Sequence, residues 1–230
     1  MFFKKDYATP GPGVDPDAPE KTGAARLGEI LSLECVSLLK LNLLFLLSCV
    51  PVVTVPPAIF AMVHVVRRMV LDQTVDCGYH YRTAFRQHWK RGYLAFSCTA
   101  LPLVVSGYGA WYYLSGAAVQ PLLLAPFTLC STVFLVTILA SAYLYGLLAA
   151  ERPAKECLRL ALILGVGRPL RAALAALSVY GTLAAAVLAF PISALYLLLI
   201  GFSVPCLLGS FFIRTVLKQF GGDRGEDQEN

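Results

Sequence analysis

The sequence predicts an all-α integral membrane helical bundle: six transmembrane helices in three hairpins, with the N- and C-termini in the cytoplasm. The first observation behind this is composition: 57% of the 230 residues are hydrophobic, only 14% are charged, and the mean hydropathy is +0.67. A soluble domain carries about 25% charged residues, most of them on its surface. The other two observations are where charged residues are missing and on which side the basic ones lie.

Three windows contain no Asp, Glu, Lys or Arg: 41–66, 92–150 and 172–213. A charge at the centre of a spanning helix costs roughly 2.5–3.5 kcal/mol, so windows without charges indicate membrane segments. One span needs about 20 apolar residues, so the second and third windows each fit two, divided near Pro121 and Pro191. The predicted spans are 31–50, 57–71, 93–114, 121–148, 171–190 and 193–214.

The first apolar region leaves two alternatives, two short helices or one long kinked span. Pro51 and Pro56-Pro57 would separate two helices, and the basic residues favour this reading. All 19 Lys and Arg lie in 4–40, 67–91, 152–171 and 214–224, and the turns between paired spans have none. Cytoplasmic loops collect Lys and Arg, so three hairpins with both termini inside explain the pattern. A five-span chain with one span at 41–66 would put the N-terminal arm outside.

The polar ends frame one membrane domain. Residues 1–26 are rich in Pro, Gly and charge and predict an irregular cytosolic N-terminal arm. Residues 27–220 form the single transmembrane helical domain, and 221–230 are a disordered C-terminal tail. The net charge of +5 comes from the cytosolic loops and tails, and therefore indicates no nucleic-acid partner.

Small and polar residues inside the spans predict helix contacts. Four-residue spacing of small residues predicts close packing at Gly181, Ala185, Ala189 and Ser193, and again at Ala142, Gly146 and Ala150. Asn42 lies in a strongly apolar run, so we expect it to hydrogen-bond between helices in a structural role.

An aromatic and basic segment, residues 79–91, is the strongest candidate for a surface contact. Tyr81, Phe85 and Trp89 recur every four residues, with Arg82, Arg86 and Lys90 beside them. This spacing predicts an amphipathic helix on the inner membrane surface, with its aromatics among the headgroups and its cations toward anionic lipid. Two interpretations stay open: docking to a partner such as a transport ATPase, or a surface connector without a partner.

Motifs of catalysis and metal binding do not occur in the sequence. It has no Gly-Lys-Ser/Thr phosphate loop, no His-Glu-x-x-His and no Gly-x-Ser-x-Gly. Asp76, Cys77 and His80 fall short of the four ligands that structural zinc takes. No carboxylate lies deep in a span, which argues against a carrier coupled to protons or sodium. We therefore expect no enzyme activity, catalytic residue, cofactor or metal, and no disulfide framework among the seven cysteines.

The block at 39–54, with Asn42, Pro51 and Thr54, resembles the opening of the YesL-like family of small bacterial multi-pass membrane proteins, a domain of unknown function. The arm at 7–14, the segment 85–92 and the end at 211–220 are similar to that family too. The resemblance implies a multi-pass protein of the bacterial cell (inner) membrane, associated with carbohydrate uptake. Asn42, Pro51 and Thr54 are its motif and packing residues.

Two functional hypotheses follow. The first is a non-enzymatic accessory component of carbohydrate uptake, with the lipid bilayer and carbohydrate transporter components as its partners. The second is a stand-alone facilitator or channel for a small solute.

Overall fold

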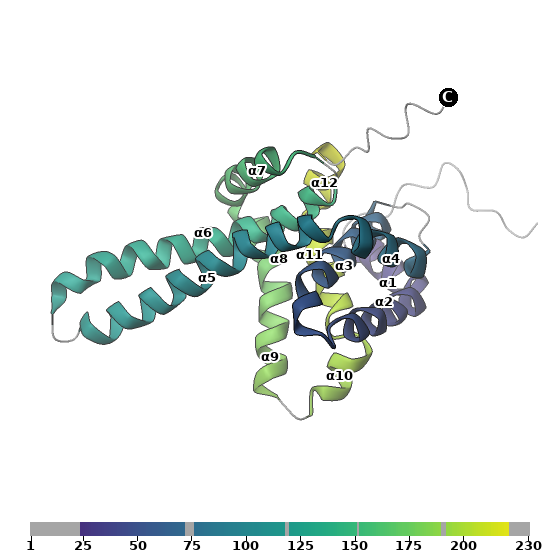
Figure 1. The fold of residues 1–230 in the computed structure, drawn as a ribbon, viewed down its shortest axis with the longest axis horizontal. Helices are drawn as coiled ribbons and strands as arrows, with labels where there is room; N and C mark the ends of the chain where they lie inside the picture. Colours follow the sequence, from purple (N-terminus) through teal and green to yellow (C-terminus); the bar gives the residue numbers. More distant parts are fainter. Residues whose placement is uncertain (1–23, 72–75, 118–119, 151, 190–191, 221–230) are drawn as a thin grey trace, which may run out of the picture.

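The computed structural model describes residues 24–71, 76–117, 120–150, 152–189 and 192–220, and regular structure in these residues is helical throughout (Figure 1). The predicted tail at 221–230 and all but the last three residues of the predicted arm at 1–26 lie outside the described residues.

The first charge-free window, 41–66, is divided between two α-helices, as the basic residues favoured, with a short 3-10 turn between them and a further helix before them. Helix α1 spans Ala24–Leu33, α2 spans Cys35–Ser48, the short η1 spans Val52–Thr54 and α3 spans Val55–Val70. The two prolines at 56–57 lie in the first turn of α3, where the backbone N–H groups have no helical acceptor and proline is tolerated. They therefore start α3. Helix α3 is the central helix of the molecule, in contact with α2, α4, α5, α6 and α11.

A long hairpin follows a short amphipathic helix. Helix α4 spans Cys77–Gln87, α5 spans Trp89–Ala117, η2 spans Pro121–Leu123 and α6 spans Leu124–Leu148. The α5–α6 hairpin projects well beyond the other helices (Figure 1). Its projecting surface is apolar and exposed, at Leu101, Val104, Trp111, Leu129, Val133 and Leu135 among others.

The remaining helices run from α7 to α12. Their bounds are α7 Ala154–Gly167, α8 Pro169–Ala176, the π-helical η3 Leu177–Gly181, α9 Thr182–Leu188, α10 Ala194–Leu199, α11 Ser203–Phe212 and α12 Arg214–Phe220. Segments α8, η3 and α9 form one rod. Helices α10 and α11 return beside it and are separated by the break at 200–202. The predicted last span, 193–214, is therefore not one continuous helix.

Within the residues that the structure describes, four helices are long and apolar enough to cross a membrane, judged by length and composition: Val52–Val70, Trp89–Gly116, Pro121–Leu148 and Pro169–Leu188. Apolar helices α2 and α11 are shorter, at 14 and 10 residues. Each predicted span thus coincides with helical residues, while four of the six regions form helices of membrane-spanning length.

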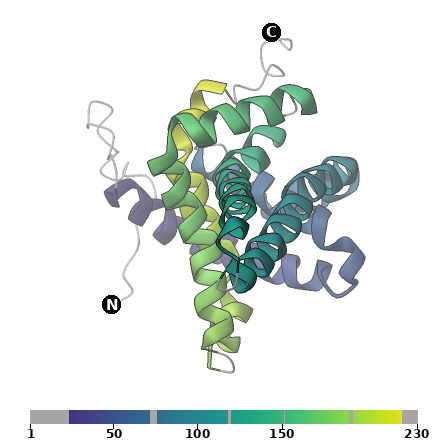
Figure 2. The same ribbon diagram turned by 90° about the vertical axis from the view of Figure 1, so that its left-hand side faces the viewer.

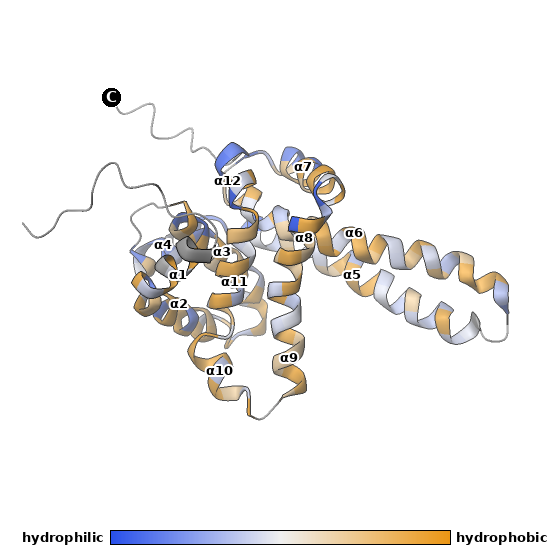
Figure 3. Ribbon diagram, turned by 180° about the vertical axis from the view of Figure 1, so that it is seen from behind, coloured by the Kyte–Doolittle hydropathy of each residue, from blue (hydrophilic) through white to orange (hydrophobic). Residues whose placement is uncertain are grey.

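The hairpins do not point in one direction. Figures 1 and 2 agree that α5–α6 runs across the direction of α8, η3 and α9. Hydrophobic residues occur along the whole length of the α5–α6 hairpin and of the α8–η3–α9 rod (Figure 3). The charge pattern predicts on which side each loop lies, but it contains no information on the angle between hairpins.

Close backbone contact and two arginines fix the base of the α5–α6 hairpin. A Cβ on Gly92 would lie 2.8 Å from Cα of Pro57, so only glycine lets α5 cross the start of α3 this closely. At the same base, where α6 ends, Nη1 of Arg91 donates to the carbonyl of Leu148 (3.1 Å) and Nη1 of the buried Arg67 donates to that of Ala149 (3.5 Å). These two carbonyls lie at the C-terminal end of α6, where carbonyls have no N–H donor within the helix.

One of the two predicted small-residue faces is confirmed. Gly146 packs against α12, where a Cβ would lie 2.8 Å from Cδ2 of Leu217. The face on the fifth span is wrong, because Ala185 and Ala189 are exposed. The alanines that pack in this rod are instead Ala172, Ala175, Ala176 and Ala186.

Candidate functional site

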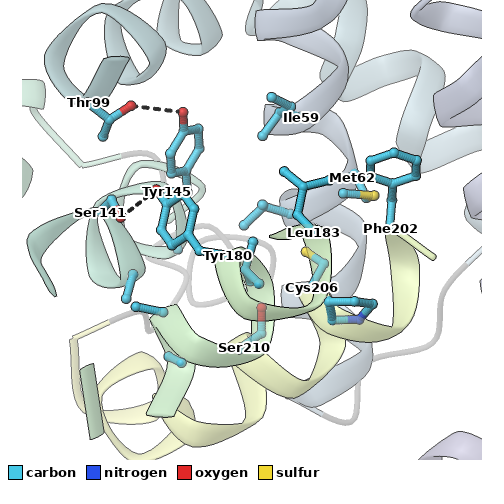
Figure 4. Close-up of a pocket in the computed structure, with 18 of the residues that line it drawn as sticks. Ile59, Met62, Thr99, Ser141, Tyr145, Tyr180, Leu183, Phe202, Cys206 and Ser210 are labelled. Carbon is cyan, nitrogen blue, oxygen red and sulfur yellow. Dashed lines mark hydrogen bonds between the residues drawn. The ribbon is translucent and has the colours of Figure 1, made fainter. Parts of the chain in front are cut away.

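A cavity of about 450 Å³ lies where the base of the α5–α6 hairpin meets α3, the α8–η3–α9 rod and α11. Its volume lies within the range of small-molecule sites, roughly 300–1,000 Å³. Most of its lining is aliphatic or aromatic, including Ile59 and Met62 from α3, Leu183 from α9 and Phe202 beside α11 (Figure 4). Cys206 and Ser210 belong to the α11 wall. Among the described residues that line the cavity there is no Asp, Glu, Lys, Arg or His.

Two tyrosine hydroxyls supply much of the polarity of this cavity. The hydroxyl of Tyr145 lies 3.2 Å from Oγ1 of Thr99, which joins α6 to α5. The hydroxyl of Tyr180 lies 3.0 Å from Oγ of Ser141, which joins η3 to α6 (Figure 4). Each bond links two helices across the cavity wall.

Tyr180 belongs to the π-helical turn η3, Leu177–Gly181. A π-helical turn inserts an extra residue and redirects side chains, and such turns occur often at functional sites. The neighbouring Ser178 donates to the carbonyl of Ala175 (2.8 Å) and lies 3.4 Å from that of Pro205 on α11. The π turn therefore lines the cavity and contacts α11, which forms another part of its wall.

Asn42 connects α2 to the break between α10 and α11. Its Nδ2 donates to the carbonyls of Leu197 (3.0 Å) and Leu198 (2.8 Å), at the end of α10. Its Oδ1 accepts from the backbone N–H of Phe202 (3.1 Å) and of Ser203 (3.3 Å), at the start of α11. The side chain is fully buried, and the contacts are those of an interhelical hydrogen bonder with a structural role.

Pro51 and Thr54 form the turn between α2 and α3. Oγ1 of Thr54 lies 2.5 Å from the carbonyl oxygen of Ser48 and 2.6 Å from that of Pro51, and its single proton can be donated to either one. The hydroxyl of Tyr93 on α5 donates to the carbonyl of Val53 (2.6 Å). The three motif residues therefore act at two places: Asn42 at the α10–α11 break, and Pro51 and Thr54 at the turn.

The aromatic and basic segment at 79–91 is divided between two helices. Helix α4 ends at Gln87, so Tyr81 and Phe85 lie on α4 whereas Trp89 begins α5. Tyr81 is 1% exposed in the core and Phe85 packs against the same core, so these aromatics face protein rather than headgroups. Burial raises the pKa of Tyr81 to about 12, which keeps its phenol neutral.

The basic residues of this segment form the exposed face that the spacing predicted. Arg82, Arg86 and Lys90 are exposed, and the Nζ of Lys90 lies 5.6 Å from the ring centre of Trp89. Arg82 and Arg86 lie on α4 and Lys90 lies in the first turn of α5; we call the three together the α4 basic face. Its contact with a membrane surface or partner stays a prediction.

The three residues weighed as a weak metal motif have separate structural roles. Asp76 caps α4, with Oδ1 accepting from the N–H of Gly78 (3.1 Å) and Tyr79 (3.4 Å). Nη1 of Arg68 donates to Nδ1 of His80 (2.9 Å), since an arginine can only donate. Burial, then Arg68, lowers the pKa of His80. Cys77 is buried, and burial raises the pKa of its thiol.

The sequence did not single out the cavity residues Thr99, Ser141, Tyr145 and Tyr180. Ser141 and Tyr145 lie four residues apart and share one face of α6, a spacing that could have indicated a polar stripe. Their partners come from segments about 40 residues away in sequence, and no local pattern predicts that pairing.

Fold and site together define a class: the described part of the chain is all-α, with four helices long and apolar enough to cross a membrane and an apolar cavity between helices. Residues 38–109 match the model of a family described as "Protein of unknown function, DUF624". The matched segment contains Asn42, the turn at 51–54, α3, α4 and the first part of α5. No curated protein and no solved structure matches the chain.

Proposed function

We propose that this protein is a non-enzymatic, six-span protein of the bacterial inner membrane that accompanies a carbohydrate import system. The observation that carries the membrane part is the exposed apolar surface of the α5–α6 hairpin and of the α8–α9 rod. Exposure of this apolar surface to water costs roughly 25 cal/mol of free energy for each Å². A bilayer covers such a surface.

The six spans are α2, α3, α5, α6, the α8–α9 rod and α10–α11, and both termini are cytoplasmic. Helix α2 has 14 residues, which is about 21 Å of helix, short of the roughly 30 Å hydrocarbon core. Helix α1 precedes α2 and is separated from it by a bend at Glu34. For all three hairpins to cross one bilayer along its normal, α5–α6 must turn about its base relative to the α8–α9 rod.

The link to carbohydrate uptake rests on the resemblance of residues 39–54 to the YesL-like family. The α4 basic face offers the surface for a partner. Exposed cations on this side contact anionic lipid or an acidic protein surface, while the aromatics behind them anchor α4 to the core.

The cavity supports an accessory role over a stand-alone facilitator. A polar solute that crosses the cavity would lose its hydrogen bonds to water and meet a mainly apolar wall. Each polar group left without a partner costs several kcal/mol. Among the described lining residues, hydroxyls and thiols are the side-chain polar groups, so the wall has no charged general base. This favours a binding protein without catalytic activity.

Affinity purification of the full chain in mild detergent, followed by mass spectrometry, tests the partner. We expect carbohydrate transporter components with the unmodified chain, and their loss with Arg82→Ala, Arg86→Ala and Lys90→Ala combined. Lys155→Ala with Arg159→Ala, on exposed positions of α7, is the matched control and should retain them. Repeated recovery of no transporter component would contradict the proposal.

A further inference from the structure

The hydrogen bonds around the cavity determine which polar group a ligand can offer. Oγ1 of Thr99 donates its single proton to a backbone carbonyl of its own helix, Ala95 at 2.9 Å or Phe96 at 3.2 Å. Oγ of Ser141 likewise donates to the carbonyl of Ile138 (2.7 Å). A hydroxyl has one proton, so neither Thr99 nor Ser141 has a second proton for its tyrosine.

With the protons of Thr99 and Ser141 donated to these carbonyls, the phenols are the donors in the tyrosine pairs. In this arrangement Tyr145 donates to Oγ1 of Thr99 and Tyr180 to Oγ of Ser141, across contacts in which either hydroxyl can be the donor. Each phenol has then used its proton and keeps only acceptor lone pairs. Both residues line the cavity (Figure 4), which thus presents two hydrogen-bond acceptors to its contents.

The rest of the wall determines the remainder of the ligand. Its carbon-rich surface takes an apolar chain, and the described lining has no cation to hold a carboxylate or phosphate. We propose that the cavity binds an uncharged lipid alcohol, whose chain fills the apolar space and whose hydroxyl donates to the phenolic oxygen of Tyr145 or Tyr180. The proposal deepens the proposed function and rests on its membrane part, because a bilayer supplies such molecules.

Three photoactivatable probes with the same C12 chain and diazirine test this: an alcohol, its methyl ether and the carboxylic acid. Labelling of the purified full chain in detergent is mapped by peptide mass spectrometry. We expect the alcohol to label peptides of α5, α6, η3 and α11. The ether, which cannot donate, should bind about three- to tenfold more weakly, since a neutral hydrogen bond is worth about 0.5–1.5 kcal/mol.

Conservative variants identify the acceptor. Tyr145→Phe and Tyr180→Phe keep the cavity shape, and together they should abolish the preference for alcohol over ether. Tyr112→Phe, on the exposed surface of α5, should leave the preference unchanged. Equal labelling by all three probes, a preference for the acid, or labelling only on the outer surface of the hairpins would overturn the proposal. The measurement needs no partner and no bilayer, so it can fail while partner capture succeeds, and the reverse.

Discussion

At the residue scale, the side chain of Asn42 holds α2 to the break between α10 and α11. It satisfies two carbonyls and two N–H groups at a helix break, and a buried polar group without a partner costs about 1–3 kcal/mol. We expect Asn42→Ala to lower the unfolding free energy by at least about 2 kcal/mol, measured as thermal unfolding in detergent. Leu43→Ala, at an exposed neighbouring position, is the control. Equal losses in both variants would contradict this role.

His80 is the residue that makes a pH dependence testable. Its pKa is lowered from 6.5 in the folded chain by burial and by Arg68, and Asp76 opposes this shift. The unfolded chain then binds more protons below about pH 6.5, so this part of the stability is complete above that pH and is lost as pH falls. We expect the melting temperature to fall between about pH 7.5 and about pH 5.

His80→Asn should reduce that fall. The amide oxygen can still accept from Arg68, but it does not titrate. An unchanged fall in the variant would show that other groups cause the pH dependence.

The sequence predicted Asn42 but not Thr99 or Ser141, for a physical reason. An amide in an apolar run has no acceptor on its own helix, so it must find partners elsewhere. A threonine or serine hydroxyl bonds the carbonyl one turn earlier and is satisfied locally. Such residues are ordinary in apolar helices, and only the structure shows that a tyrosine hydroxyl lies within hydrogen-bond distance of each.

At the element scale, α7 packs on α6 through a glycine. A Cβ on Gly165 would lie 3.0 Å from the backbone nitrogen of Ala140 and 3.1 Å from its Cα, whereas one on Gly167 meets nothing within 4 Å. We expect Gly165→Ala to destabilise the protein by about 1–3 kcal/mol through overpacking. Gly167→Ala, on the same helix, should change stability by no more than about 1 kcal/mol. Thermal unfolding of both variants is the measurement, and equal stability would contradict the close contact.

The helix at 77–87 shows where periodicity predicts well and where it does not. Four-residue spacing identified the helix and its basic face. It did not predict the break at His88, after which Trp89 starts a helix of its own. Nor could it predict that Tyr81 faces the core, since an aromatic face packs equally well on lipid or on protein.

At the scale of the whole molecule, charge and hydropathy located the helices but not their directions. Each charge-free window overlaps at least one long apolar helix, whereas the second half of the third window forms the shorter α10 and α11. The angle between α5–α6 and α8–α9 depends on contacts at the hairpin base, such as Gly92 on Pro57 and Arg91 at the end of α6. These contacts join distant parts of the sequence, so no window of residues contains them.

Orientation in the membrane needs reporter positions that are exposed in the structure. Cys77 would be a poor reporter, because it is only 5% exposed and burial raises the pKa of its thiol. Single cysteines at Val52, Ser115 and Ile192 mark the turns of the three hairpins, and one at Arg86 marks the opposite side. All four positions are exposed.

Labelling of these four variants in intact cells with a membrane-impermeant maleimide tests the six-span account most directly, with the unmodified chain as the baseline. We expect Val52→Cys, Ser115→Cys and Ile192→Cys to react in intact cells, and Arg86→Cys to react only after permeabilisation. Reaction of Arg86→Cys in intact cells, or turns that react from different sides, would contradict three hairpins with cytoplasmic termini.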